Sequence, residues 1–185
     1  MIKGLTMMKK LVSIVFASIL LVFGLSLSGC FQHSANGTGG SSFSSGSGFP
    51  SQRAPSSRRT FIFNPKSTSW AAYDRSGALV KSGRASGGKS WCADIGRSCR
   101  TVTGSFYIYH KKGADCVSSK YPVGEGGARM PHCMFFHRGY AVHGSGDVPN
   151  YNASHGCIRV TPSAAQWLNN SFMTVGTKVI VRSYH

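Results

Sequence analysis

The sequence predicts an all-β or β-rich domain with small helices, and three observations lead to this class. Runs dense in aromatic and β-branched residues recur in the later part of the chain, at 70–73, 78–80, 105–109, 134–136, 140–142 and 178–182. Turn-forming residues separate two pairs of these runs, and 23 glycines suit many tight turns. One segment carries helix signals.

Two hairpins are expected. Asp74-Arg75-Ser76-Gly77 lies between the runs 70–73 and 78–80 and has the composition of a tight turn. His137-Arg138-Gly139 separates 134–136 from 140–142 in the same way. The run 105–109 is expected to be a strand between these hairpins.

The C-terminal part predicts a helix followed by a closing strand. Thr161 is a suitable N-cap, and Pro162 suits the first helical position because its missing N–H is not needed there. The helix is expected to continue through 163–170, and 178–182 is expected to be the last strand.

The N-terminus has the pattern of an export signal. Basic residues at its start precede an apolar run from Leu11 to Leu25, which suits a signal peptide rather than a membrane span. The segment Leu27-Ser28-Gly29-Cys30 then resembles the bacterial lipobox, whose cysteine receives lipid and becomes the new N-terminus. The alternative is an ordinary secretory signal with a chance cysteine. Phe31, rather than aspartate, follows, which favours the outer membrane facing the periplasm in a host with two membranes.

Three segments follow from this pattern. Residues 1–29 are expected to be a lipoprotein signal peptide. Residues 30–59 are expected to be the lipidated cysteine and a flexible tether, because eleven of residues 34–48 are Ser or Gly. Residues 60–185 are expected to be the folded domain.

Charge and composition exclude several classes of function. The chain has 21 Lys and Arg against 5 acids, a formal charge of +16. So few carboxylates disfavour a glycosidase or a calcium or magnesium site, and no P-loop motif is present. No cofactor or metal is expected. The acids are Asp74, Asp94, Asp115, Glu125 and Asp147.

The flanks of Cys157 single it out among six cysteines. His155 and Arg159 supply positive potential, and Gly156 lets a substrate approach the backbone; such surroundings are expected to lower the pKa of a thiol and expose it. The alternative is a buried structural thiol. His143 is the candidate base, since the loop 145–153 can fold back and bring its ring to the sulfur.

The remaining cysteines are expected to form disulfides in an oxidising compartment. With Cys30 assigned to lipid and Cys157 to chemistry, the simplest pairing is Cys92–Cys99 and Cys116–Cys133, and two other connectivities stay open. A zinc site is the rival for part of this set, but no C-x₂-C pair is present. Its ligands would be Cys116, His132, Cys133 and His137.

These residues resemble the signature of the L,D-transpeptidase catalytic domain. His143-Gly144, a loop, and Ser154-His155-Gly156-Cys157-Ile158-Arg159 match its pattern of a histidine followed by [ST]-H-G-C-[IV]-[RN]. The segments 101–106 and 129–143 resemble further stretches of the family in the same order. Val102 stands where the family usually has proline, and the loop before Ser154 is short.

The resemblance implies a fold and a chemistry. The family's fold is a β-sandwich of mixed sheets with a small helix behind the cysteine. Its substrate is the peptidoglycan stem peptide, cut between the third residue and D-Ala at position four, with 3→3 cross-links as product. By motif position, Cys157 is the nucleophile, His143 holds the proton as base or imidazolium, and the Gly144 carbonyl orients that ring.

The same motif positions imply several supporting roles. The amides of Gly156 and Cys157 are reasonable oxyanion donors. Ser154, His155 and Arg159 are expected to shape the substrate site, His155 near its mouth and Arg159 at the cysteine loop or a substrate carboxylate.

Several alternatives remain open at this stage. Water as acceptor would make an L,D-carboxypeptidase, and a protein amine would make a wall-attachment enzyme. A catalytically poor, wall-binding surface lipoprotein and a Cys/His endopeptidase of another fold are further readings. The basic charge is expected to attract carboxylate-bearing wall polymers and anionic lipid rather than nucleic acid, although a merely solvated basic surface would look the same.

Overall fold

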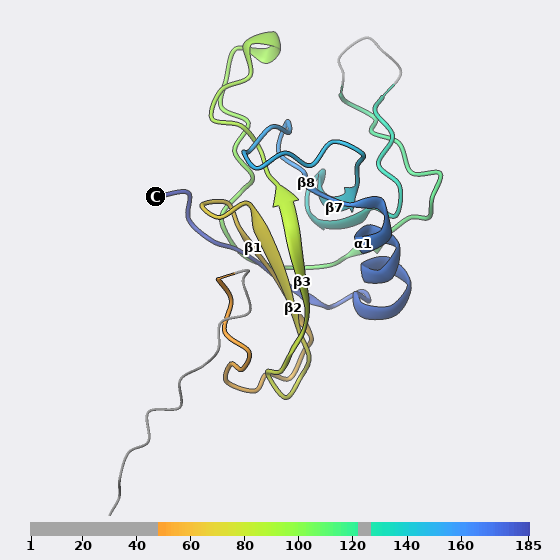
Figure 1. The fold of residues 1–185 in the computed structure, drawn as a ribbon. Coiled ribbons are helices and arrows are strands. Elements are labelled where there is room, and N and C mark those ends of the chain that lie inside the picture. Colours follow the sequence, from red (N-terminus) through yellow and green to blue (C-terminus); the bar gives the residue numbers. More distant parts are fainter. Residues whose placement is uncertain (1–47, 122–126) are drawn as a thin grey trace, which may run out of the picture. The chain divides into compact units, whose positions relative to one another are not determined.

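A computed structural model describes residues 48–121 and 127–185 of the chain (Figure 1). The predicted signal peptide, Cys30 and most of the predicted tether lie outside the described residues, as does Glu125. No helix of the described part is both long enough and apolar enough to cross a bilayer. The elements in chain order are β1 (Thr60–Asn64), β2 (Ser69–Tyr73), β3 (Leu79–Ser86), the 3₁₀ turn η1 (Ala93–Ile95), β4 (Gly104–Tyr107), β5 (His110–Lys111), β6 (Met134–His137), β7 (Tyr140–Gly144), β8 (Ile158–Val160), α1 (Pro162–Trp167), the wide helical turn η2 (Leu168–Phe172) and β9 (Lys178–Val181).

The strands of the described residues form one mixed sheet in the order β4-β9-β1-β2-β3-β8-β7-β6-β5. Two neighbouring pairs are parallel, β1 with β9 and β7 with β8. The long β3 joins the two halves, because it pairs first with β2 and then, at Ala85 and Ser86, with β8. The sheet curls so that its halves face each other, and the Phe106 and Phe136 rings lie 5.6 Å apart.

This architecture confirms the predicted fold class, mainly β with a mixed, curled sheet and short helices. Both predicted hairpins are present, β2–β3 and β6–β7, each with a register shift in its ladder. The predicted strands at 105–109 and 178–182 correspond to β4 and β9. β4 ends at Tyr107, two residues earlier than expected.

The main core lies between the two halves of the sheet and is closed by α1. Alternation along the strands accounts for it, since Phe61 and Phe63 of β1 point inward while Ile62 points to the opposite face. Ala165 and Leu168 pack on the same cluster from the helix side. Burial of these apolar side chains is the main stabilising contribution, at roughly 25 cal/mol per Å² removed from water.

The helix begins as its sequence predicts. The Thr161 hydroxyl accepts a hydrogen bond from the Ala164 amide at 3.3 Å, and Pro162 occupies the first helical position. The α-helix proper ends at Trp167 and widens into η2, which ends at Phe172. Phe172 is buried against Trp167, with ring centroids 5.3 Å apart, so packing extends the helical segment past the predicted end at 170.

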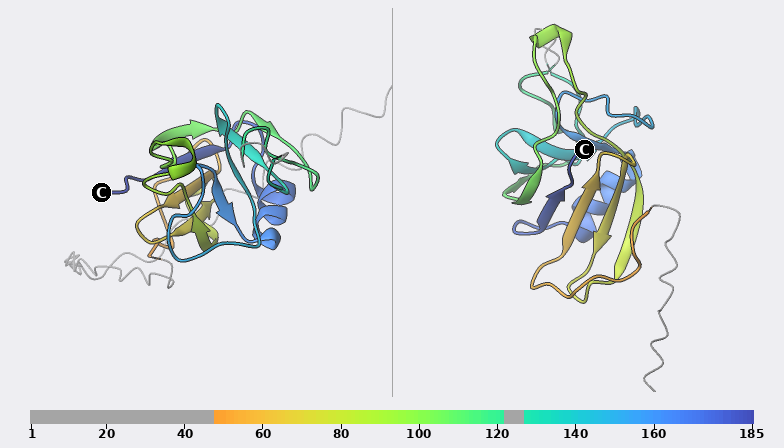
Figure 2. Two further views of the ribbon diagram at one scale, coloured as in Figure 1. Left: turned by 90° about the horizontal axis from the view of Figure 1, so that it is seen from above. Right: turned by 90° about the vertical axis from the view of Figure 1, so that its left-hand side faces the viewer.

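The packed domain starts earlier than the predicted boundary at Thr60. Phe49 has 0% exposure and packs on Ile62, Ala71 and Tyr73. We call this face of β1, β2 and β9 the outer face. The segment 48–58 lies along it, on the opposite side of β1–β3 from α1 (Figures 1 and 2). A single aromatic residue inside a Ser/Gly-rich stretch therefore joins the domain, because burying it removes a large apolar surface from water.

Residues 49–181 contain the three core clusters and both disulfides of the described part. This part of the chain is therefore expected to fold on its own.

Replacing Phe49 by alanine tests its role as an integral part of the domain. Loss of a fully buried phenylalanine is expected to lower the free energy of unfolding by about 3–5 kcal/mol. Urea denaturation followed by tryptophan fluorescence measures this change. The matched control is Val175→Ala, because Val175 is 66% exposed and its truncation should change stability by less than about 0.5 kcal/mol. Equal effects of the two substitutions would show that Phe49 only rests on the surface.

Candidate active site

Parallel pairing of β7 and β8 brings the two predicted catalytic residues together. In this ladder Val142 lies beside Ile158 and His143 beside Arg159. Cys157 directly precedes β8, and its side chain packs with Ala141. Because side chains two residues apart share a face, the imidazole and the thiol project from neighbouring strands on the same face. Strand spacing and rise place the two Cα atoms about 8 Å apart on a diagonal.

The His143 ring has one nitrogen engaged and one available. Its Nδ1–H donates to the Gly144 carbonyl at 2.9 Å, the contact that the family resemblance implied. This assignment leaves Nε2 unprotonated, and it has no hydrogen-bond partner among the described residues. Burial lowers the pKa of His143 to about 4, and the Arg159 charge acts in the same direction. The ring is therefore a neutral proton acceptor near neutral pH.

Gly144 is held from both sides, which fixes the carbonyl that orients the ring. Its N–H donates to the Pro131 carbonyl at 2.8 Å. A Cβ at this position would lie 3.1 Å from Pro131 Cγ and 3.2 Å from the Ala165 Cβ of α1. A side chain here would require Pro131 or Ala165 to move by a few tenths of an ångström, so glycine permits the close packing behind the histidine.

Cys157 is the free cysteine of the described residues and is half-buried. Burial raises the pKa of its thiol, and a backbone hydrogen bond at Ala141 and the Arg159 charge only partly oppose this rise. The thiol lies 3.8 Å from the Gly139 carbonyl. The prediction that flanking positive charge lowers the pKa of this thiol was therefore wrong, because loss of hydration outweighs that charge.

The structure contains no hydrogen bond between the thiol and the His143 ring, although both residues are fully described. Both groups are neutral at rest, since the thiol pKa is raised and the imidazole pKa is lowered. This is a thiol beside a free base, rather than a preformed thiolate–imidazolium pair. Proton transfer between the two groups requires the thiol and Nε2 to come within hydrogen-bond distance.

Ser154 shapes the turn before the nucleophile. Its hydroxyl donates to the Cys157 carbonyl at 2.5 Å and accepts from the Gly156 amide at 3.0 Å. Ser154 is 2% exposed, so the structure does not support its predicted contact with substrate. The Gly156 amide is already hydrogen-bonded to the Ser154 hydroxyl, so it is not a free oxyanion donor in this conformation. A buried hydroxyl that bonds its own turn accounts for both differences.

The backbone next to the nucleophile requires glycine. Gly156 has φ +126°, in a region that side chains rarely adopt. A Cβ there would lie 2.7 Å from Cε1 of the Tyr140 ring. The tight turn and the tyrosine together set the position from which Cys157 enters β8.

Both predicted disulfides are present, Cys92–Cys99 and Cys116–Cys133. The bond between Cys116 and Cys133 uses both thiolates that the rival zinc site would need. The second pair belongs to the cluster that also contains Met130, Ala141 and Cys157. The disulfides therefore stabilise loops next to the candidate site, as the staple interpretation predicted.

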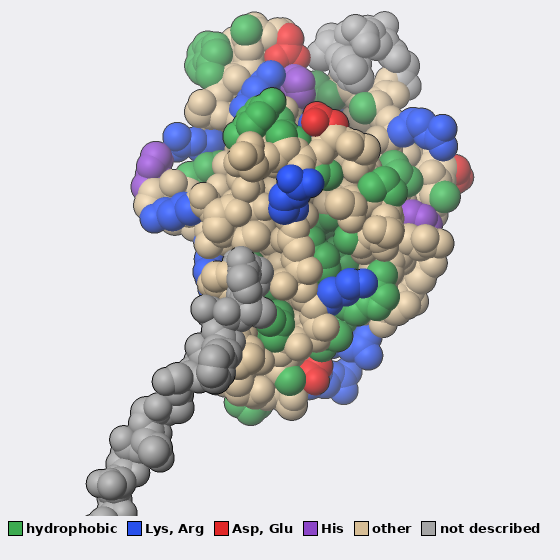
Figure 3. Space-filling model, viewed as in Figure 1, with side chains coloured by type: hydrophobic (Ala, Val, Ile, Leu, Met, Phe, Trp, Pro, Cys, Tyr) green, Lys and Arg blue, Asp and Glu red, His purple; other side chains and the backbone are tan. Residues whose placement is uncertain are grey.

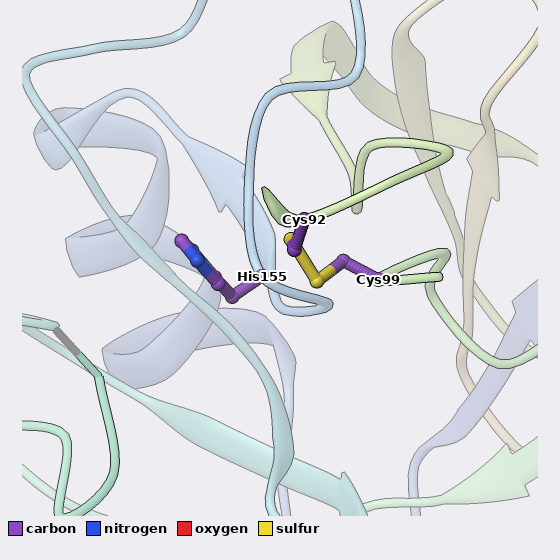
Figure 4. Close-up of side chains that lie close together, drawn as sticks. All are labelled: Cys92, Cys99 and His155. Carbon is purple, nitrogen blue, oxygen red and sulfur yellow. A yellow bond between two sulfur atoms is a disulfide. The ribbon is translucent and has the colours of Figure 1, made fainter. Parts of the chain in front are cut away.

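His155 connects the candidate site to the Cys92–Cys99 loop. Its Nε2 lies 2.7 Å from a carboxylate oxygen of Asp94, and its ring stacks on Tyr121 at 4.9 Å. The Asp94 pKa is lowered, mainly by the hydrogen bond from His155. His155 also lies beside the disulfide (Figure 4), with its ligand atom and both sulfurs within 4.8 Å of one another. The sulfurs are bonded to each other, so this group offers no thiolate to a metal.

Arg159 has a carboxylate partner. Its guanidinium donates to Asp147 at 2.7 Å, and Asp147 is well exposed. Arg159 lies opposite His143 in the ladder and acts electrostatically on both His143 and Cys157. A substrate carboxylate, one of its two expected partners, would therefore have to compete with Asp147.

Sequence reasoning did not find Asp94, Tyr121, Tyr140 or Asp147 at this site. Asp147 had a usable signal, because it is one of only 5 acids and lies in the loop between His143 and Ser154. Asp94 and Tyr121 had none, since both reach His155 from segments distant in sequence. Tyr140 lies at the start of β7, and only the fold brings its ring to Gly156.

Comparison with known proteins agrees with this arrangement. The family model described as YkuD, L,D-transpeptidase catalytic domain, matches residues 58–181. No curated protein matches the chain. Among solved structures, an L,D-transpeptidase from Xylanimonas cellulosilytica is 31% identical over 72% of this chain and 64% of its own, with a TM-score of 0.61.

Two further structures share the fold at lower identity. An L,D-transpeptidase from Mycobacterium smegmatis is 22% identical, and LdtMt1 in complex with imipenem is 23% identical. Each match covers 68% of this chain and 59% of the other, with a TM-score of 0.56. The chain thus spans about three fifths of the length of these solved relatives.

The low pKa of His143 predicts a specific dependence of stability on pH. An unfolded chain takes up a proton on this residue near pH 6.5, whereas the folded protein does so only near 4. The stabilisation is complete above pH 6.5 and is lost as the pH falls toward 4, by up to about 3 kcal/mol. Urea denaturation across this range should show a smaller loss in His143→Gln than in the original chain. Identical pH dependence in both would contradict the neutral, buried ring.

The disulfide pattern predicts one reactive thiol in oxidised residues 48–185. Thiol titration under denaturing conditions should give one equivalent, and none in Cys157→Ala. In the native protein, alkylation should be slow at neutral pH and accelerate above pH 8.5, because the thiol pKa is raised. Fast native alkylation at pH 6 would instead indicate a thiolate. Three or more titrating thiols would overturn the disulfide assignment.

Proposed function

The chain belongs to the L,D-transpeptidase catalytic-domain family, and on this premise we propose that it is a cysteine acyltransferase acting on peptidoglycan stem peptides. The observation that carries the proposal is the shared face of β7 and β8. It presents a thiol and a neutral imidazole whose Nδ1–H is already committed to the Gly144 carbonyl. Such an arrangement suits acyl transfer through a thioester.

The first half-reaction uses this pair. The Cys157 side chain rotates toward His143, and the thiol proton passes to Nε2 as sulfur attacks the carbonyl carbon of the third stem residue. The negative charge that develops on sulfur raises the imidazole pKa, which makes a ring of low resting pKa an adequate acceptor. The tetrahedral intermediate collapses, the C–N bond breaks, and His143 returns the proton to the amine of the departing D-Ala. A thioester on Cys157 remains.

The second half-reaction resolves the thioester. The amine of a second stem attacks the carbonyl, His143 accepts its proton, and the C–S bond breaks with the proton returned to sulfur. The product is a 3→3 cross-link. With water in place of the amine the enzyme is an L,D-carboxypeptidase, and with a protein amine it attaches that protein to the wall.

The Cys157 amide is the preferred oxyanion donor. The Gly156 amide is bonded to the Ser154 hydroxyl, so it contributes only after the turn rearranges. One preorganised donor of this kind is worth roughly 3–4 kcal/mol of transition-state stabilisation. Because the Gly156 amide is already bonded, we expect one oxyanion donor rather than a pair.

The location of the enzyme belongs to the same proposal. Lipid on Cys30 anchors it to a bacterial membrane, the outer membrane facing the periplasm where the host has one. The Ser/Gly-rich stretch then lets the domain reach the wall. Because an L,D-transpeptidase of the same fold is solved with imipenem, we also expect carbapenems to acylate Cys157.

Mass spectrometry of stem-peptide products tests the activity. Residues 48–185 incubated with disaccharide-tetrapeptide should release D-Ala and form cross-linked dimer, and Cys157→Ala should form neither. His143→Gln should lower kcat/KM by roughly 10²–10⁴-fold, because it removes the proton acceptor.

The matched control is His110→Gln, since His110 is exposed on β5 and should keep full activity. D-Ala release without dimer would identify a carboxypeptidase. If the folded protein binds wall fragments but forms no product, the chain is a wall-binding lipoprotein rather than an enzyme. Near-normal turnover in His143→Gln would reject the role of the ring.

A further inference from the structure

A cavity of about 230 Å³ opens on the outer face, away from the candidate active site. It lies where the segment 53–56 crosses β1 and β9, and polar and basic side chains line it. The strands β7 and β8, which carry Cys157 and His143, lie on another side of the domain in Figure 1 and both views of Figure 2. The polar and basic lining includes the side chains of Arg53, Ser56, Thr60, Tyr73 and Lys178.

Positive charge converges on this cavity without a matching set of acids. Arg53 lies 5.2 Å from the centre of the Tyr73 ring, and Arg182 lies 4.9 Å from that of Phe49. Both guanidinium groups act on the Tyr73 hydroxyl, where they partly offset the rise in its pKa that burial causes. Lys178 lines the cavity on the β9 side.

None of these three cations has an ion-pair partner in the described part of the chain. Its two ion pairs, His155–Asp94 and Arg159–Asp147, both lie at the candidate active site. One acid, Asp74, lines the cavity, and its carboxylate already accepts from the Ser76 hydroxyl at 2.6 Å and the Ala78 amide at 3.0 Å. Two positive charges of the lining, Arg53 and Lys178, therefore face one committed carboxylate, and Arg182 adds a third charge nearby, over Phe49. This balance suits an anionic ligand.

The same face is where the chain from the predicted lipid site arrives. Phe49 is fully buried against Ile62, Ala71 and Tyr73, so the polypeptide leaves the domain beside this cavity. Cys30 lies 19 residues before Phe49 in the sequence, a span of at most about 65 Å even when fully extended. A lipid on Cys30 would therefore keep the outer face within reach of the bilayer surface.

We propose that the outer face docks on anionic phospholipid, with a headgroup phosphate in the cavity between Arg53 and Lys178. The proposal rests on the lipid anchor of the proposed function and commits to the bilayer, because the anchored chain enters the domain at this face. The Ser56 hydroxyl lines the cavity and can donate to a phosphate oxygen, because in this structure it only accepts, from the Arg58 amide. The Thr60 hydroxyl already donates to the Arg58 carbonyl at 3.4 Å. Docking in this orientation turns β7 and β8 away from the bilayer, toward the wall.

Vesicle co-sedimentation tests this docking without the anchor. Residues 48–185, which carry no lipid site, are mixed with vesicles of phosphatidylcholine alone or with 30% phosphatidylglycerol at low salt. Binding to the anionic vesicles is expected, together with at least tenfold weaker binding in 0.5 M NaCl and on neutral vesicles. Arg53→Glu, Lys178→Glu and Arg182→Glu combined should reduce the binding at least tenfold.

A control of equal charge change separates a site from general attraction. Basic side chains also occur elsewhere on the surface, as Figure 3 illustrates for one face. The combined Arg100→Glu, Lys112→Glu and Lys120→Glu variant has the same net charge as the test variant and changes exposed side chains that do not line the cavity. It should retain binding within about threefold. Equal loss in both variants would overturn the proposal, since only net charge would then matter.

Further measurements separate loss of charge from loss of packing, and binding of lipid from binding of free phosphate. Arg53→Lys with Arg182→Lys preserves the charge and should still bind, which separates lost charge from loosening of Phe49. Protection of the domain against thermal unfolding by inorganic phosphate, without vesicle binding, would show a site for free phosphate and overturn docking on lipid. D-Ala release from soluble substrate should be unchanged in the Glu variant, so failure of docking and failure of the proposed enzyme remain distinguishable.

Discussion

The parallel pairing of β7 with β8 is the contact on which the candidate site depends. It joins two strands that a loop separates in sequence, and its register places His143 beside Arg159 and Cys157 beside Ala141. A shift of one residue would turn either the ring or the thiol into the main core, because successive side chains point to opposite faces. The inward-facing Val142, Ile158 and Val160 prevent that shift, since they are fully buried in the main core. Core packing thereby sets the geometry of the chemistry.

Desolvation is the second constraint on the site. The same burial that positions the ring and the thiol removes water that would stabilise their charged forms. It lowers the pKa of His143 and raises that of Cys157, and the Arg159 charge does not reverse the balance at the thiol. The resting pair is therefore neutral. In the proposed reaction, an imidazolium that forms on His143 is stabilised by the Gly144 carbonyl, which is already in place.

Two loops that carry disulfides meet the motif from outside the sheet. One contributes Asp94 to His155, and the other lies beside Cys157. Without these covalent links, the two loops would lose more conformational entropy on ordering next to the site. The outer face of β1, β2 and β9 has a different composition, with cations over aromatic rings and a buried Phe49. Catalytic and basic features thus occupy different parts of one curled sheet.

Local patterns in the sequence determined the mainly β class, both hairpins and the start of the helix, because each of these depends on neighbouring residues. The cysteines allowed three disulfide connectivities, and the fold selected the simplest of them. The motif also identified Cys157, His143 and Gly144. The reactivity of a thiol, the basicity of an imidazole and the small size of glycine are properties of the residue types themselves.

Tertiary structure alone decided the rest. Phe49 is part of the domain because it packs on apolar side chains of the outer face. The Ser154 hydroxyl and the Gly156 amide are hydrogen-bonded within the turn itself. Asp94 and Tyr121 reach the motif from segments distant in sequence, and Tyr140 meets Gly156 only because β7 pairs with β8. The protonation states of Cys157 and His143 also depend on the fold, because burial shifts both pKa values. Burial results from the packing of the whole domain and cannot be deduced from the residues adjacent in sequence.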